Sequence, residues 1–240
     1  MNSLLLVPNV GGGLIINIYI SHSVGCAGWD MERIYQNTLF QTGCRTMRFK
    51  DADIGKVKML DWDFLEWEKK PAKVEARHLE LARDYEFEVV MSMDLWKHNI
   101  HEALSYADEL QKHTDQVLIP IHYYVPELLQ YDLAYPNANW FAGNVFPPAD
   151  YRDRITHILG GSPQSQIAHL TTSQIDLFGH SLKFKKVTSI DGNQIFNVAI
   201  RAGKEWYPEK PYWRKAEVEI PNELIFRNSV KKFNEVIINL

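Results

Sequence analysis

At 240 residues the chain is long enough for one large α/β domain or two small ones. Its hydrophobic content of 45% and charged content of 23% exclude wholesale disorder and a fibrous architecture. The net charge of −4 excludes a protein that coats nucleic acid through an overall positive potential. Nucleic-acid contact is therefore restricted to local basic clusters. The candidates are 183–186 and 231–232, for which solvated surface is the favoured interpretation.

The two cysteines, Cys26 and Cys44, form neither a disulfide framework nor a four-cysteine zinc site. We therefore expect no metal and no cofactor, and a reducing, cytoplasmic setting. The apolar opening at 4–7 is cut off by Pro8, so it is too short for a signal sequence, and no apolar run is long enough to span a membrane.

Short apolar runs of β character recur along the chain. Two near the N-terminus, at 4–7 and 14–21, are followed by runs at 56–62, 88–94, 116–123, 139–145, 156–162 and 174–181. Near-continuous apolar runs are typical of strands covered on both faces, as in a parallel sheet, and the stretch 99–112 between two of them has the apolar spacing of a helix. Up to eight strands alternating with helices favour a (β/α)8 barrel, with a doubly wound open sheet as the alternative.

The pattern changes after residue 181. Residues 183–200 alternate around Asp191-Gly192-Asn193, which predicts a β-hairpin with its turn at these three residues. An irregular loop is expected at 205–213 and a closing helix at 222–238. The sequence thus predicts a single domain over 1–240, an α/β barrel carrying a C-terminal hairpin and helix.

In a parallel barrel the chemistry lies at the carboxyl ends of the strands, so polar residues that end apolar runs are candidate site residues. These residues are Asp61, Asp94, His122, Gly143 with Asn144, Gly160 with Gly161, and Asp176. Aspartates that converge at one rim supply a nucleophile, a proton donor and a ligand for a base edge. Such aspartates could also bind a divalent cation. Each one alone is better explained as a helix cap or a strand-end hydrogen-bond partner, and His122 is equally explained as a core histidine.

The order of these segments resembles the tRNA-guanine transglycosylases and their relatives that insert 7-deazaguanines into DNA. MLD at 59–61, VVMSMD at 89–94, IPIHYY at 119–124, WFAGNV at 140–145, ILGGSP at 158–163 and QIDLFGHS at 174–181 are similar, in order, to six strand-end motifs of that family. The resemblance covers about 56–240 and implies a base-exchange enzyme that acts on nucleic acid. Because the zinc site of the tRNA enzymes is absent, it favours DNA over tRNA.

The resemblance implies a role for each candidate residue. Asp61 is expected to transfer a proton and Asp94 to hold the guanine edge. Contacts to the base are expected from His122, Gly143, Asn144, Gly160 and Gly161.

The nucleophile is the point of departure from the family. The position that matches the family's nucleophilic aspartate is Gly179, so either Asp176 attacks from a shifted frame or the chain has lost that nucleophile. Asp176 lies on the opposite face of a strand from position 179, which weighs against the shift. The alternatives are a non-catalytic member that binds a 7-deazaguanine or nucleic acid, and an unrelated barrel hydrolase or isomerase.

Overall fold

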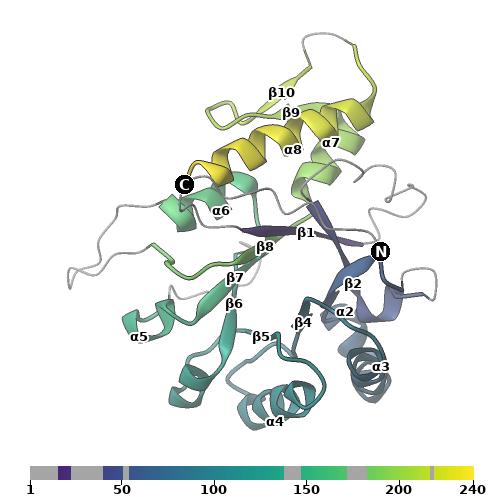
Figure 1. Cartoon of the computed structure of the whole chain (residues 1–240), viewed down its shortest axis with the longest axis vertical. Coiled ribbons are helices and arrows are strands. Elements are labelled where there is room, and N and C mark those ends of the chain that lie inside the picture. The colour runs from purple at the N-terminus through teal and green to yellow at the C-terminus, as the bar shows by residue number, and fades with distance from the viewer. Residues whose placement is uncertain (1–15, 23–39, 51–53, 138–146, 172–182, 217–218) are drawn as a thin grey trace, which may run out of the picture.

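The computed structural model describes residues 16–22, 40–50, 54–137, 147–171, 183–216 and 219–240. Within them, eight parallel strands form one sheet in chain order (Figure 1). The strands are β1 Asn17–His22, β2 Phe40–Arg45, β3 Val57–Asp61, β4 Val89–Met91, β5 Val117–Pro120, β6 Asp132–Pro136, β7 Ile155–Leu159 and β8 Ser189–Asp191. β1 pairs with both β2 and β8, so the sheet closes into a barrel. This closure excludes the open doubly wound sheet.

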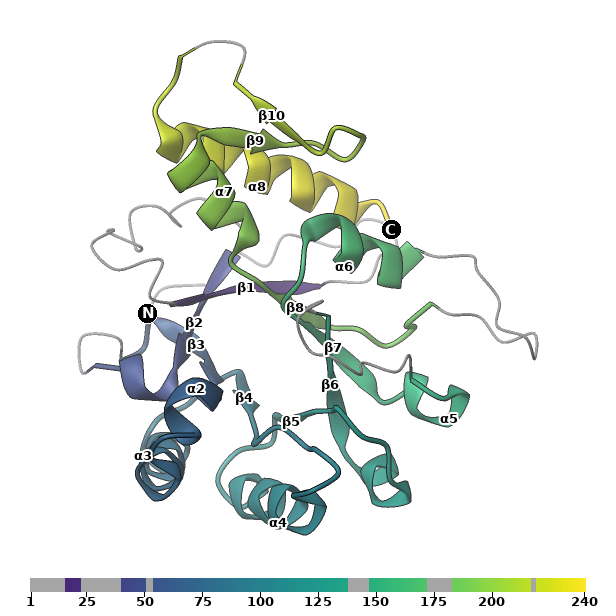
Figure 2. The same ribbon diagram turned by 180° about the vertical axis from the view of Figure 1, so that it is seen from behind.

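Helices surround the barrel on its outer side (Figures 1 and 2). They are α2 Phe64–Trp67, α3 Pro71–Asp84, α4 Ile100–Gln111, α5 Ala149–Arg152, α6 Pro163–Thr171, α7 Gln194–Ala202 and α8 Asn222–Ile238, with 3-10 turns η2 Thr46–Arg48 and η4 Pro126–Gln130. The helix expected at 99–112 is confirmed, because Ala103, Ala107 and Leu110 face the barrel at helical spacing. The closing helix begins and ends where the sequence predicts.

Four of the predicted strands are confirmed within a few residues, namely β3, β4, β5 and β7, and β1 falls within the run at 14–21 except for its last residue. The runs at 4–7, 139–145 and 174–181 lie outside the described residues. The sixth strand of the barrel is β6 at 132–136 and the eighth is β8 at 189–191. β2 was not anticipated from the sequence.

The predicted hairpin at 183–200 is wrong. Ser189–Asp191 pair in parallel with β1 and β7, and α7 begins three residues after Asp191. The buried residues of α7 are Ile195, Phe196, Ala199 and Ile200, whose spacing is the stripe of a helix and not the alternation of a strand.

The hairpin of the C-terminal appendage lies further along the chain, in the segment expected to be an irregular loop. It consists of β9 Lys204–Trp206 and β10 Trp213–Lys215, which pair antiparallel. With α7 and α8 it forms a layer outside the barrel wall, next to β1 and β8 (Figures 1 and 2). The fold class, a barrel with a C-terminal hairpin and helix, is therefore confirmed, with the hairpin at a different place.

Among the described residues, no helix combines the length and the apolar character needed to cross a bilayer.

Candidate active site at the carboxyl ends of the strands

Three aspartates lie at the carboxyl ends of barrel strands. Asp61 ends β3, Asp94 follows β4 by three residues, and Asp191 ends β8. Because all eight strands are parallel, these ends meet at one rim. Asp191 and Asp94 lie near enough to Asp61 for both to raise its pKa, so the barrel brings the three carboxyl groups together.

The environment of Asp61 perturbs its pKa strongly. Its side chain is 14% exposed, and burial, followed by the charge of Asp191, raises its pKa to about 7. Asp94 and Asp63 act in the same direction. Arg45, whose Nε lies 3.7 Å from Asp61 Oδ2, lowers the pKa, but burial and the carboxylates outweigh it. Near neutral pH, Asp61 is therefore divided between its protonated and ionised forms, as a general acid requires.

Asp94 is held by His122, another of the candidate residues. His122 Nε2 lies 2.9 Å from Asp94 Oδ1, and the two side chains are only 2% and 9% exposed. The ring of Trp96 stacks on that of His122, with centroids 3.7 Å apart and planes within 2°. Asn99 Nδ2 also donates to the Asp94 carbonyl at 2.9 Å. Both the backbone and the side chain of Asp94 are therefore held by hydrogen bonds.

Asp191 is the site residue that the sequence reading missed. Its Oδ1 accepts a hydrogen bond from the Gly160 N–H at 2.6 Å and lies 3.4 Å from Nε2 of the fully buried His157. His157 Nδ1 in turn lies 2.8 Å from Ser189 Oγ, on the same face of β8 as Asp191. The local signal was weak, because VTSID holds only two apolar residues before its aspartate, and Asp191-Gly192-Asn193 has the composition of a turn.

The diglycine after β7 joins Asp191 to the rest of the rim. Gly160 and Gly161 have φ of +69° and +84°, which favour glycine. No described atom lies within 4 Å of the place a Cβ at Gly160 would take, whereas one at Gly161 would lie 2.4 Å from Asn137 Nδ2. Gly160 thus faces open space and Gly161 is packed against the residue that follows β6.

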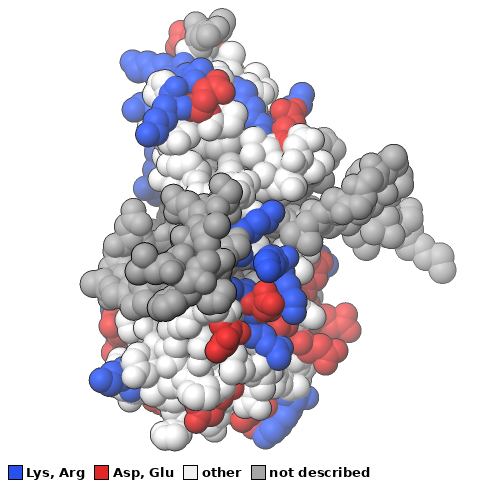
Figure 3. Space-filling model, turned by 90° about the vertical axis from the view of Figure 1, so that its left-hand side faces the viewer, with Lys and Arg blue, Asp and Glu red and all other residues white. Residues whose placement is uncertain are grey.

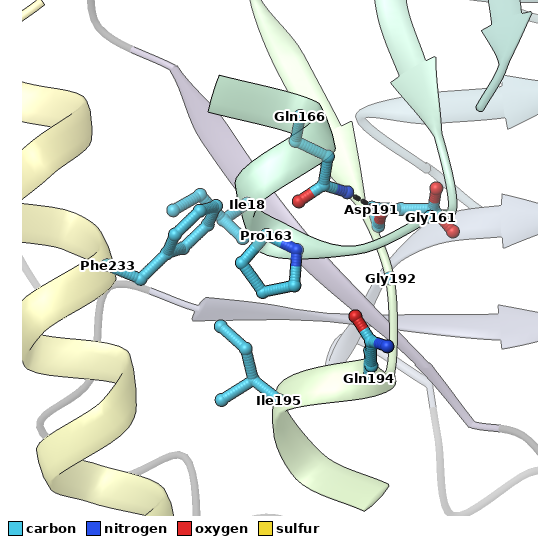
Figure 4. A pocket seen from close by; sticks show the side chains of 9 residues that line it. All are labelled: Ile18, Gly161, Pro163, Gln166, Asp191, Gly192, Gln194, Ile195 and Phe233. Atoms are coloured by element: carbon cyan, nitrogen blue, oxygen red, sulfur yellow. Dashed lines mark hydrogen bonds between the residues drawn. The ribbon is translucent and has the colours of Figure 1, made fainter. Parts of the chain in front are cut away.

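Gln166 closes the outer side of this turn. Its Nε2 donates to the carbonyl of Asp191 at 2.6 Å (Figure 4) and to that of Gly160 at 3.0 Å. Behind it, α6, the start of α7 and Phe233 of α8 enclose a cavity of about 10 Å³, the size of one water site. This cavity is too small for a heterocycle.

The other candidate residues, Gly143, Asn144 and Asp176, lie outside the described residues. Within the described part of the chain, no group of three His, Cys, Asp or Glu side chains is placed to hold a metal ion.

The fold and the rim define a class of protein, a parallel (β/α)8-type barrel with a cluster of aspartates at the carboxyl ends of its strands. Residues 36–237 match the model of a family of unknown function, DUF6610, and the chain belongs to that family. Searches of the curated proteins and of the solved structures find no match.

Proposed function

We propose that this protein exchanges guanine in a nucleic acid for a 7-deazaguanine through a covalent glycosyl-enzyme on an aspartate. The observation that carries the proposal is the pairing of Asp61, whose pKa is raised to about 7, with Asp191, which is fixed by the Gly160 N–H. Glycosyl transfer with retention needs two such carboxyl groups, one protonated and one ionised.

In this proposal Asp191 replaces Asp176 as the nucleophile. Asp191 ends the last strand of the barrel, the strand that carries the nucleophile in the family that the sequence resembles. Its Oδ1 is occupied by Gly160 and His157, and Oδ2 has no hydrogen-bond partner among the described residues. Oδ2 is therefore the oxygen that attacks, and His157 is a positioning residue beneath it.

The reaction proceeds in two displacements. Asp191 Oδ2 bonds to the anomeric carbon as the bond to guanine breaks, and the leaving base takes its proton from Asp61. The ionised Asp61 then accepts the proton of the incoming 7-deazaguanine. The nitrogen of that base attacks the anomeric carbon, and the ester to Asp191 breaks.

The remaining rim residues suit the recognition of a guanine-like base. Asp94, oriented by His122, accepts hydrogen bonds from the N–H edge of the heterocycle. The open space beside Gly160 allows a flat ring to approach the backbone. The target nucleotide must leave its base stack to reach this rim, at a cost of a few kcal/mol.

The non-catalytic alternative was motivated by the glycine at position 179. Because Asp191 supplies a carboxylate at the end of the last strand, the glycine at position 179 no longer argues against catalysis.

The test is the incorporation of labelled guanine into DNA and into tRNA. We expect Asp191→Asn and Asp61→Asn to lower the rate by a factor on the order of 100 or more. Asp132→Asn removes an exposed carboxyl at the amino end of β6 and serves as the matched control. Peptide mapping of the trapped intermediate should place the adduct on Asp191. An adduct on another residue would refute Asp191 as nucleophile, and the absence of exchange with every nucleic acid would refute the function.

A further inference from the structure

The hairpin β9–β10 carries two lysines that face each other. Lys204 and Lys215 are directly paired across the two strands, and both are exposed. Like charges directly opposite each other destabilise a strand pair. The neighbouring pair, Arg214 opposite Glu205, has the complementary charges that folding favours. Stability alone therefore does not explain the lysine pair.

These lysines have no acidic partner in the part of the chain that the structure describes. Within the described residues, Lys204, Lys215 and the exposed Lys210 in the hairpin loop form no ion pair closer than 4.0 Å, whereas Lys232 lies 2.6 Å from Glu205 and Arg214 lies 3.4 Å from Glu209. The three uncommitted lysines are called the lysine surface below. Basic side chains, with acidic ones among them, lie at the top of the molecule in Figure 3.

Side-chain and backbone contacts hold the hairpin β9–β10 in place. Trp206 is fully buried against Phe233 of α8, with ring centroids 5.5 Å apart, and its backbone N–H donates to Ser229 Oγ at 2.9 Å. The Tyr207 ring contacts two cations, with Lys232 Nζ 3.5 Å and Arg214 Cζ 4.2 Å from its centroid. The hairpin that carries the three lysines is therefore anchored to α8.

We propose that the lysine surface of Lys204, Lys210 and Lys215 binds the phosphodiester backbone of a nucleic acid. Uncommitted lysines in a chain of net charge −4 create a local positive field that suits a polyanion. Tyr212 and Trp213 of the same hairpin are half-buried against the hydrophobic core, so the lysines, and not aromatic stacking, carry the proposal.

The position of the hairpin links it to the candidate active site. This inference rests on the proposed function for the identity of the substrate. α7 begins three residues after Asp191 and ends two residues before Lys204, and its nine residues span about 14 Å. At about 3.4 Å per nucleotide along a strand, this helix length corresponds to about four phosphates. The lysine surface would thus bind backbone outside the target nucleotide.

The experiment compares the full chain with a variant in which Lys204, Lys210 and Lys215 are all changed to Gln. The control variant carries the same charge change at Lys69, Lys73 and Lys112, which lie on the α2–α4 side of the barrel, away from the hairpin (Figure 1). Affinity for labelled duplex DNA, single-stranded DNA and RNA is measured over a salt series.

Loss of three phosphate contacts should reduce the slope of log affinity against log salt by about 2.7 for a duplex and about 2 for a single strand, with no change in the control. Because the variant removes the repulsion between Lys204 and Lys215, its melting temperature should be unchanged or higher. Comparison of the three nucleic acids identifies which backbone is bound.

An equal salt slope in the wild type and the hairpin variant would overturn the inference, even if base exchange is active. Equal affinity for polyglutamate and nucleic acid would also overturn it, in favour of an acidic protein partner. A reduced slope without any base exchange would support the lysine surface and refute the proposed function.

Discussion

Asp61 links the chemistry of the candidate site to the stability of the fold. Burial, and after it the charge of Asp191, raises its pKa from the ordinary 3.8 to about 7. The folded state therefore holds this proton more tightly than the unfolded chain does. The corresponding stability is fully present below pH 4 and is lost as the pH rises towards 7. This rise in pKa corresponds to about 4 kcal/mol of unfolding free energy, because each pKa unit is worth about 1.4 kcal/mol.

Asp61→Asn replaces the carboxyl with a neutral group of the same shape, so the stability that the wild type loses as the pH rises should be retained in this variant. We expect the variant to be more stable than the wild type at pH 8 by up to about 4 kcal/mol, and the difference to shrink towards zero at pH 4. Urea unfolding at several pH values measures it, with Glu86→Gln, which removes an exposed carboxyl, as the control. Parallel pH dependences for wild type and Asp61→Asn would show that the Asp61 pKa is not raised.

Two further predictions concern the recognition of the base and the turn that supports it. Asp94→Asn removes the charged acceptor held by His122 and should weaken the binding of free 7-cyano-7-deazaguanine by about 10-fold or more in titration calorimetry; unchanged affinity would contradict the role of Asp94. Gly160→Ala should cost about 1–2 kcal/mol of unfolding free energy because of its positive φ alone, whereas Gly161→Ala, whose Cβ would collide with Asn137, should cost clearly more. Equal losses in denaturant unfolding would contradict the packing described for Gly161.

The candidate site is supported by a network that reaches beyond the three aspartates. Asn137 Nδ2 donates to Ser165 Oγ at 2.9 Å, and its Oδ1 lies 2.9 Å from His169 Nε2. Burial lowers the pKa of His169 to about 4, so this histidine is neutral over the physiological range. The diglycine turn, which holds Asp191, is thus braced by neutral hydrogen bonds that do not change between pH 5 and 8.

Local patterns in the sequence determined much of this protein. The apolar runs that end at Asp61 and Asp94 contain β3 and β4, and α4 and α8 occupy the predicted residues. These elements carry their signal within a few consecutive residues, as apolar periodicity and as polar residues at strand ends. The barrel followed from their alternation, and with it the expectation that Asp61, Asp94 and His122 share one rim.

The tertiary structure alone decided the place of Asp191. Ser189–Asp191 is too short to show a period, and its strand character depends on pairing with β1 and β7, at positions such as Ile18 and Ile158 that are distant in the sequence. The raised pKa of Asp61 has the same origin, because it needs burial and a carboxylate from another strand. Long-range pairing and shared burial leave no local mark in a single sequence, so the sequence predicted the barrel and two of its rim aspartates but not the residue opposite them.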